Sequence, residues 1–507
     1  MRFLSCFNLF NEFNLLFMEV GAVISLEGPS TSQFWFVVKK GIELKKHQYV
    51  QLQTKEGLLV GRIEELEKTN KYFSNPETVS EFESYGRNLN EQFPVERWEY
   101  LIANVKPLGV FVNGEEKRVT IPPSPSTKVY LAENDILKKV FGFDDNGLSI
   151  GTVENHDLEV KLNITRLLKK HVAILGISGS GKSHLTNVLI EEMLLRENSP
   201  AIIVIDPHGE YTAFLQDERF SYKTKVWNKD NISFATYRLS ANSFGELIPE
   251  MSAAQKRDLA KIIEKFREKK KVYDLSELIK EVENSDIKQN VKTALVSWLE
   301  DLNSSNLFSN IDKPSLQELA RVSGLSVIDL SSFVHLKEKQ IVVARIARSL
   351  FEARRSKAIP PFIIIIEEAH QFCPEREEES LAISRNVIEQ IAREGRKFFA
   401  SLVLISQRPI RLSTTALSQC NTHIILRITN PYDLQHVEES SEGITSEISR
   451  AISGLKVGEA FVVGEAVNFP VLIKVRKRSV KAEGEKLLDE EVKEFMNYNK
   501  EYVDFFF

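Results

Sequence analysis

The chain has 507 residues, of which 42% are hydrophobic and 27% charged, and its formal net charge is −5. This composition excludes a disordered or fibrous protein and is typical of a globular protein with roughly two to four domains. Because the net charge is small, any nucleic-acid site must be a local concentration of Lys and Arg, since no basic field extends over the whole molecule.

The three cysteines, Cys6, Cys373 and Cys420, are odd in number and show no CxxC spacing. This pattern argues against a disulfide framework or a zinc site and suits a reducing compartment. We interpret all three as packing residues. No stretch reaches about 18 uninterrupted apolar residues, so the sequence predicts no membrane-spanning helix, and we expect a cytoplasmic protein.

Residues 1–17 superficially resemble a secretory signal. Asn8, Asn11, Glu12 and Asn14 interrupt the apolar run, and no A-x-A cleavage pattern follows. Since the first regular strand pattern begins at Met18, we expect residues 1–17 to be an N-terminal extension.

Residues 18–120 contain short β-type runs separated by glycines and charged turns. These runs lie at 22–25, 34–38, 49–52 and 58–60. Their spacing predicts a small β-barrel. The run Pro122-Pro123-Ser124-Pro125-Ser126 resists both helix and central strand, so we interpret it as a linker.

From about residue 170 the pattern changes to apolar runs that alternate with amphipathic helices. Runs that are apolar on both faces predict an α/β fold with a parallel sheet covered by helices. They lie at 171–175, 201–205, 326–330, 362–366, 402–405 and 424–426. We expect one core from residues 121–243 and 315–478, a helical insertion at 244–314, and a charged C-terminal tail at 479–507.

The segment Gly176-Ile177-Ser178-Gly179-Ser180-Gly181-Lys182-Ser183 matches the P-loop pattern G-x-x-x-x-G-K-[ST] between a strand and a helix. Glycines let backbone amides converge on phosphate oxygens, and the helix N-terminus adds partial positive charge. We expect Lys182 to contact the β and γ phosphates of ATP and Ser183 to ligate Mg²⁺. The predicted nucleotide-binding residues are Gly176, Gly179, Ser180, Gly181, Lys182, Ser183 and His184.

Two acids, Glu367 and Glu368, follow the all-apolar run at 362–366. A P-loop ATPase needs one carboxylate for the magnesium shell and one that orients or deprotonates the attacking water. We assign Glu367 to the magnesium side, where its length implies contact through a water, and Glu368 to catalysis.

Another polar residue, Gln407, ends the apolar run at 402–405. It is the candidate sensor of the γ phosphate, although a polar side chain capping the sheet would look the same. Just before that run, Arg393 and Arg396 are candidates for an arginine finger, with Arg396 preferred. An exposed basic helix end remains the alternative interpretation.

The segment Asp206-Pro207-His208-Gly209-Glu210-Tyr211 follows the run at 201–205, at the carboxyl end of a predicted strand. Ligands bind at this end in open α/β sheets, so Asp206 could support the nucleotide site. A tight turn is an equally good interpretation. His208 has no second His or Cys at ligand spacing, so we do not expect it to bind a metal.

Taken together, LGISGSGKS, DPHGEY, IIIIEEAH, AREGRK, ISQRP, GEAFVVG and FPVLIKVRKR resemble, in order and spacing, the motifs of the HerA family of archaeal hexameric DNA translocases and helicases. The resemblance covers roughly residues 18–480. It implies a RecA-like ATPase core and an N-terminal barrel of the type found in rotary ATP synthases. It also implies that Gly179 to Ser183 bind phosphate and magnesium, that Glu367 and Glu368 form the hydrolytic pair, and that Arg396 or Arg393 completes a neighbour's site.

The same resemblance implies a homohexamer that threads double-stranded DNA. Its implied partners are the NurA nuclease and the double-strand-break repair nuclease complex, with which it would resect DNA ends for homologous recombination. Candidate DNA contacts are Arg376, Arg385 and Arg411, because a ring multiplies a modest basic patch. The densest basic run, Lys269-Lys270-Lys271, is more typical of a solvated face.

Two other functions remain open on the sequence. An ATP-gated clamp could position a nuclease on DNA without moving, and a rotary-type ATPase subunit could combine a barrel with a P-loop. The predicted helical insertion argues against the rotary subunit. Arg166, or Arg476 with Lys477, could stack on the adenine base, although an ordinary surface position explains them equally well.

Overall fold

The computed structural model of the protein describes residues 18–26, 28–70, 77, 79–80, 84, 99–112, 115–375, 382–441 and 443–480. The expected extension at 1–17 and nearly all of the tail at 479–507 lie outside these residues. The chain forms two compact units. Unit 1 is Met1–Gly147, Gly151–Lys161 and Val467–Lys474, and unit 2 is Leu148–Ile150, Leu162–Ala466 and Val475–Phe507.

Unit 1 is built around a closed β-barrel, which confirms the predicted N-terminal barrel. Its strands follow the order β2-β1-β7-β3-β4-β5, and β5 pairs back onto β2 to close it. The strands are β1 (Glu19–Ile24), β2 (Phe34–Val38), β3 (Tyr49–Gln53), β4 (Leu58–Asn70), β5 (Glu99–Val112) and β7 (Lys128–Leu131), with β6 (Glu115–Lys117) added beside β5.

The barrel encloses an apolar core. Its side chains include Phe34, Phe36, Val50 and Leu52, all fully buried. The strand β7 follows the proline run at 122–126 and pairs with β1 and β3, so barrel strands lie on both sides of that run. Unit 1 also contains α5 (Asn134–Phe141), half of β8 (Leu148–Val153) and most of β9 (Glu159–Leu162) and β20 (Val471–Val475).

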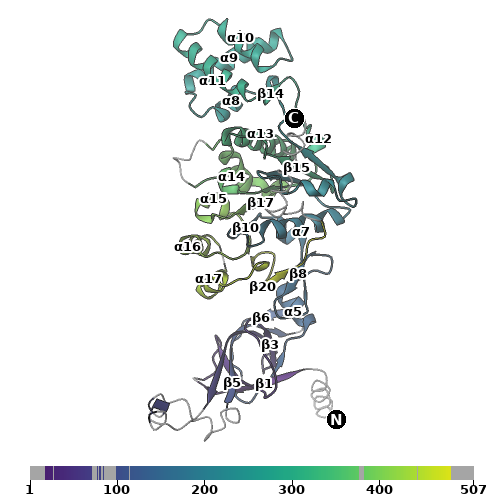
Figure 1. The fold of residues 1–507 in the computed structure, drawn as a ribbon, viewed down its shortest axis with the longest axis vertical. Coiled ribbons are helices and arrows are strands. Elements are labelled where there is room, and N and C mark those ends of the chain that lie inside the picture. Colours follow the sequence, from purple (N-terminus) through teal and green to yellow (C-terminus); the bar gives the residue numbers. More distant parts are fainter. Residues whose placement is uncertain are drawn as a thin grey trace, which may run out of the picture. The chain divides into compact units, whose positions relative to one another are not determined.

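Unit 2 contains the predicted parallel sheet (Figure 1), which confirms the α/β fold class. Within this unit the strands follow the order β12 (Thr224–Trp227), β15 (Leu325–Asp329), β11 (Ala201–Asp206), β16 (Phe362–Ile366), β17 (Ala400–Ser406), β10 (Val172–Leu175), β18 (Thr422–Ile425) and β19 (Glu459–Gly464). All neighbours are parallel except β18 and β19. Every residue of β10, β11, β16 and β17 is buried, as expected of strands covered on both faces.

The strand β17 is longer than the apolar run at 402–405 that predicts it. Ser401 and Ser406, which look polar in the sequence, are buried within it. The Ser401 hydroxyl donates to the Leu168 carbonyl, so the strand can include this polar side chain without leaving it unpaired.

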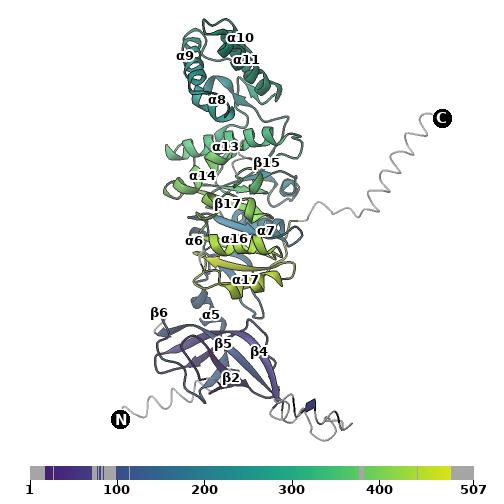
Figure 2. The same ribbon diagram turned by 90° about the vertical axis from the view of Figure 1, so that its left-hand side faces the viewer.

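Helices pack beside this sheet. The helix α14 contacts both β17 and α13, as Figure 2 illustrates for the two helices. The helices of the core are α6 (Ile164–Leu168), α7 (Lys182–Leu195), α12 (Leu316–Leu319), α13 (Leu336–Arg355), α14 (Arg385–Glu394), α15 (Thr414–Leu417), α16 (Pro431–Ser440) and α17 (Ser446–Ser453). None of the helices in the described part of the chain combines the length and apolar composition that a membrane crossing requires.

The segment interpreted as an insertion is helical. It contains α8 (Ala241–Leu247), α9 (Ala253–Lys269), α10 (Leu275–Glu283) and α11 (Gln289–Ser304), which lie together in Figure 1. Capping boxes at Ser240, Ser252 and Asp274 begin the first three helices. At the base of the segment, β13 (Phe234–Ala235) pairs with β14 (Phe308–Ser309). The exact boundaries of the insertion stay a prediction.

Candidate functional site

The predicted P-loop connects β10 to α7. Its last residues begin the helix, since Lys182 is the first residue of α7 and Gly181 is its N-cap. Gly179 and Gly181 have φ angles of 73° and 106°, which side chains other than glycine rarely adopt. The loop therefore has the backbone that an anion-binding turn at a helix N-terminus requires.

Backbone hydrogen bonds fix this loop to neighbouring segments. The Gly176 amide donates to the Ser406 carbonyl at 3.3 Å, and the Ile177 amide donates to the Arg427 carbonyl at 2.9 Å. On the other side, the Gly458 amide donates to the Ser180 carbonyl at 3.2 Å. The position of the loop is thus set by the ends of β17 and β18 and by the turn before β19.

Lys182 lies in a confined, acidic environment. Its side chain folds back, and Nζ donates to the Ile177 carbonyl at 3.1 Å. Burial lowers the pKa of Lys182, while the nearby carboxylates of Glu367, Glu368 and Glu210 act in the opposite direction. These interactions place the predicted phosphate-binding lysine beside both predicted catalytic acids.

Glu367 directly follows β16 and is 3% exposed. The Tyr211 hydroxyl donates to its Oε2 at 2.7 Å. Burial raises the pKa of Glu367 to about 8, although the Tyr211 hydrogen bond and the Lys182 charge both favour the ionised form. A bound cation would supply the positive charge that this buried carboxylate lacks.

The loop after β11 brings Tyr211 to that position. The buried Asp206 carboxylate accepts the amides of His208, Gly209 and Glu210 through Oδ1 and that of Tyr211 through Oδ2. The segment after β11 therefore forms a tight turn, which is one of the two interpretations that the sequence allows. The turn also holds Tyr211 beside Glu367. Tyr211 is a residue of the candidate site that the sequence does not identify, because the motif DPHGEY gives its spacing from Asp206 but not its contact with Glu367.

Glu368 adopts a left-handed backbone conformation, with φ 49° and ψ 45°. Such a conformation costs a glutamate roughly 1 kcal/mol or more, so the surrounding structure must impose it. Burial raises the pKa of Glu368, whereas charge from Lys182 and a hydrogen bond from Gln407 lower it. The predicted sensor Gln407 thus contacts the predicted catalytic acid.

His370 lies next to Glu368 in the short helical turn Ala369–Gln371. Its Nδ1 is 3.2 Å from Glu368 Oε2 and 3.1 Å from Ser406 Oγ. Burial lowers the pKa of His370 to about 4, and the charges of Arg408, Arg411 and Lys182 lower it further. The ring is therefore neutral near pH 7.

The oxygen atoms at this site suit a magnesium–nucleotide complex. Among the described residues no group of three or more His, Cys, Asp or Glu side chains could hold a metal alone. Mg²⁺ typically uses one or two carboxylates, waters and substrate phosphates, so Ser183 with Glu367 fits it better than a protein cage would. A Cβ added at Gly179 would meet nothing within 4 Å, so the loop has open space beside it.

The two arginine-finger candidates differ in their contacts. Arg393 Nη1 lies 3.4 Å from Glu389 Oε2. Arg396 is exposed, and in the part of the chain that the structure describes it has no hydrogen-bonding or ion-pairing partner. Of the two, Arg396 has its guanidinium free for another molecule.

The basic residues considered for DNA have different surroundings. Arg376 lies outside the described residues. Arg385 pairs with Glu389 at 2.9 Å, and Arg411 is exposed. In the helical segment Lys269 pairs with Glu281 at 2.5 Å, and Lys270 pairs with Glu277, which fits a solvated face.

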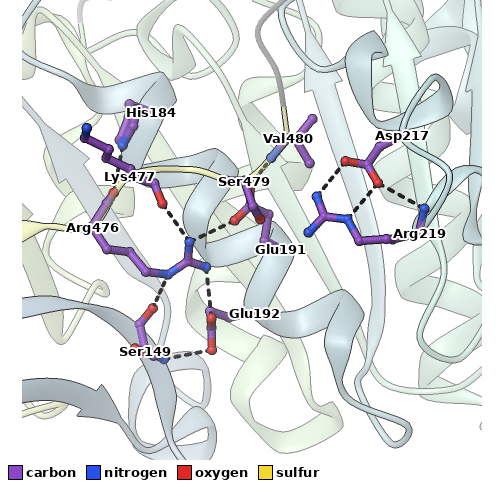
Figure 3. Close-up of polar contacts among 10 residues, drawn as sticks. All are labelled: Ser149, His184, Glu191, Glu192, Asp217, Arg219, Arg476, Lys477, Ser479 and Val480. Atoms are coloured by element: carbon purple, nitrogen blue, oxygen red, sulfur yellow. Dashed lines mark hydrogen bonds and ion pairs between the residues drawn. The ribbon is translucent and has the colours of Figure 1, made fainter.

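The segment after β20 is anchored to α7 (Figure 3). Arg476 Nη1 donates to Glu191 Oε2 and Nη2 to Glu192 Oε1, both at 2.9 Å. Glu191 is fully buried, and its Oε1 accepts the amides of Ser479 and Val480 at 2.7 Å. His184 Nε2 donates to the Arg476 carbonyl at 2.8 Å. Arg476 is thus engaged in holding the helix that begins at the P-loop.

Other residues noted in the sequence have structural contacts. Arg166 Nε donates to the Glu465 carbonyl at 2.8 Å. Cys373 and Cys420 are buried and free, and burial raises the pKa of both thiols. Cys6 lies outside the described residues.

Comparisons with known proteins show which family the chain is similar to. Residues 148–350 match the family described as Helicase HerA, central domain. The chain is 30% identical over 417 residues to the DNA double-strand break repair helicase HerA of Saccharolobus solfataricus, covering 77% of this chain and 79% of that relative. It is 26% identical over 524 residues to the HerA of Pyrococcus furiosus, covering 90% and 92%.

A solved structure shares the fold. VirB4 of Thermoanaerobacter pseudethanolicus matches with a TM-score of 0.53 and 15% sequence identity, covering 66% of this chain and 98% of that chain. This similarity supports the P-loop ATPase fold.

The buried carboxylate of Glu367 predicts a pH dependence of stability. Its pKa is about 8 in the folded protein against an ordinary value of 4.5, so between these values the folded state binds more protons than the unfolded state. Stability should therefore fall as pH rises from 4.5 to 8. Glu367→Gln removes this contribution, and without nucleotide or Mg²⁺ it should be more stable than the wild type at pH 8 by at least about 1 kcal/mol.

Unfolding curves at several pH values measure this difference. Glu352→Gln, an exposed change on α13, should keep the wild-type dependence. The same dependence of unfolding free energy on pH in the wild type and in Glu367→Gln would contradict a raised pKa of Glu367 in the folded protein.

The ion pairs of Arg476 with Glu191 and Glu192 predict that replacing this partly exposed arginine strongly lowers the free energy of unfolding. Arg476→Ala leaves the buried Glu191 carboxylate without its cation, which should cost about 3 kcal/mol of unfolding free energy. The matched control is Arg219→Ala, because the half-exposed Arg219 pairs with Asp217 in the same region (Figure 3), and the change should cost no more than about 1 kcal/mol. Urea unfolding followed by tryptophan fluorescence measures both, and equal losses would contradict the anchor.

Proposed function

Because the chain belongs to the HerA helicase family, we propose that it works as a ring of six copies that uses ATP hydrolysis to move along double-stranded DNA. Membership of this family identifies the chain as an ATP-hydrolysing helicase of DNA repair. The hexameric ring, the movement along duplex DNA and the nuclease partner are our proposals.

The position of Arg396 carries the proposal of a ring. The P-loop, Glu367 and Ser406 lie at the carboxyl ends of β10, β16 and β17, whereas Arg396 precedes the first residue of β17. The seven residues of β17 span about 20 Å, so Arg396 lies at the opposite edge of the sheet from its own nucleotide site. An arginine side chain cannot cross that distance. A free arginine at that edge can instead complete the site of a neighbouring copy.

The residues of the site then have distinct tasks. Lys182 and the P-loop amides hold the β and γ phosphates, and Ser183 with Glu367 would hold Mg²⁺, Glu367 through a water. When bound, Mg²⁺ neutralises the charge that develops on the phosphates. Glu368 orients or deprotonates the attacking water, and Gln407 hydrogen-bonds to it or to the γ phosphate. Arg396 of the neighbouring copy stabilises the charge of the transition state.

Loops at the carboxyl edge of the sheet would contact DNA and move it when ATP is hydrolysed. The loop at 207–218 begins at the Asp206 turn, which is connected to Glu367 through Tyr211. A movement of Glu367 on hydrolysis would therefore shift that loop through its hydrogen bond with Tyr211. Contacts to phosphates, which carry no sequence information, would make movement independent of DNA sequence. Docking of the NurA nuclease would couple this movement to resection of DNA ends.

Glu368→Gln separates a motor from an ATP-gated clamp. It keeps the size of the side chain, so ATP should still bind, but hydrolysis should fall at least about 100-fold because the general base is lost. With NurA present, a motor should lose processive resection of duplex ends. A clamp that only positions the nuclease should keep nuclease stimulation by bound ATP.

Glu352→Gln serves as the control and should hydrolyse ATP like the wild type. The wild-type ATPase rate should rise with duplex DNA, and the protein should displace a strand or a bound roadblock. ATP hydrolysis that responds to neither DNA nor NurA, without displacement, would contradict the motor.

A further inference from the structure

Ser406 connects three parts of the nucleotide site. It is the last residue of β17 and is fully buried. Its carbonyl accepts the amide of Gly176, the first residue of the P-loop, at 3.3 Å. Its hydroxyl accepts the Arg408 amide at 3.0 Å and lies 3.1 Å from His370 Nδ1. One small side chain thus contacts both the turn that carries Gln407 and the turn that carries Glu368.

His370 lies between Ser406 and Glu368. Its side chain is 12% exposed, and its Nδ1 is at nearly equal distances from Ser406 Oγ and Glu368 Oε2, 3.1 and 3.2 Å. Only the contact with Ser406 has the geometry of a hydrogen bond, and Glu368 Oε2 is buried without such a partner in the described residues. Because Nδ1 carries at most one proton, it can donate to only one of the two oxygens at a time.

The backbone of Glu368 is held independently of its carboxylate. The Gln371 amide donates to the Glu368 carbonyl at 2.8 Å, and the Gln340 side chain donates to the Gln371 carbonyl at 2.9 Å. These bonds fix the left-handed turn but do not touch the carboxylate. Among the described residues, His370 and Gln407 lie against the carboxylate, and Lys182, His208 and Glu210 act on it through their charges. The direction of the carboxylate therefore depends on how firmly the His370 ring is placed.

We propose that His370 and Ser406 are positioning residues that aim the Glu368 carboxylate at the attacking water. Ser406 fixes the His370 ring, and the ring packs against Glu368 Oε2. The Ser406 carbonyl accepts the Gly176 amide and so holds the P-loop in a fixed position relative to that ring. This inference rests on the proposed function, in which Glu368 is the hydrolytic carboxylate. Neither residue contacts the nucleotide in this scheme.

Four full-length variants test the proposal through the ATPase reaction with duplex DNA. His370→Phe keeps a ring but loses Nδ1, and it should lower kcat about tenfold with KM for ATP unchanged within about twofold. His370→Asn places a polar atom near the position of Nδ1 and should recover most of that loss. Ser406→Ala should also lower kcat. The double variant His370→Phe with Ser406→Ala should be no slower than the slower of the two single variants, because both changes remove the contact between His370 Nδ1 and Ser406 Oγ.

Ser401→Ala is the matched control, because Ser401 is also a buried, hydrogen-bonded serine of β17. It should leave kcat within about twofold of the wild type, which excludes a general effect of weakening the strand. Any one of four results would overturn the proposal. They are a normal kcat in His370→Phe, a rise in KM in place of the fall in kcat, no recovery in His370→Asn, and losses that multiply in the double variant.

Glu368→Gln makes the two levels of inference distinguishable. If Glu368→Gln abolishes hydrolysis while His370→Phe and Ser406→Ala remain normal, the positioning role fails and the proposed function stands. If Glu368→Gln hydrolyses ATP normally, the catalytic assignment itself fails and the positioning role fails with it.

Discussion

The parallel register of β10, β16 and β17 is the constraint on which the site depends. Leu175 lies opposite Ser406, and Ile366 lies opposite Leu404, so the residues that follow these strands emerge at one edge. The hydrogen bond from the Gly176 amide to the Ser406 carbonyl extends this pairing into the P-loop. A slip in the register would move Lys182 away from the two glutamates even if every local motif stayed intact.

The site concentrates unfavourable features that its surroundings must compensate. Glu367 is an acid buried almost completely, and Glu368 adopts a left-handed backbone. Both cost stability in the absence of ligand, as is common at functional sites. The compensating groups come from other segments, with the Tyr211 hydroxyl reaching Glu367 from the Asp206 turn. These hydrogen bonds connect the candidate site to the loop that follows β11.

The sequence predicts the local features of the fold well. The strand runs and the P-loop follow from residue patterns within a few positions, and both the α/β sheet and the barrel are confirmed. Tyr211, His370 and the Glu191–Arg476 pair could not be assigned, because their roles depend on residues that are distant in sequence. Glu191 is an example, because an acidic residue in a helix is usually exposed to solvent. In the structure it is fully buried and accepts a hydrogen bond from Arg476. The site roles of Glu367, Glu368 and Arg396 stay predictions.

Mixing two inactive variants tests most directly whether neighbouring copies complete the site. Lys182→Ala cannot hold the phosphates but can still donate Arg396, whereas Arg396→Ala keeps its own site and lacks only the donated arginine. If each site uses its neighbour's Arg396, equal mixing should restore ATP hydrolysis to roughly a quarter of the wild-type rate, the share of interfaces with both groups intact. If each chain completes its own site, the mixture will be no more active than the sum of the two variants, and this account will be contradicted.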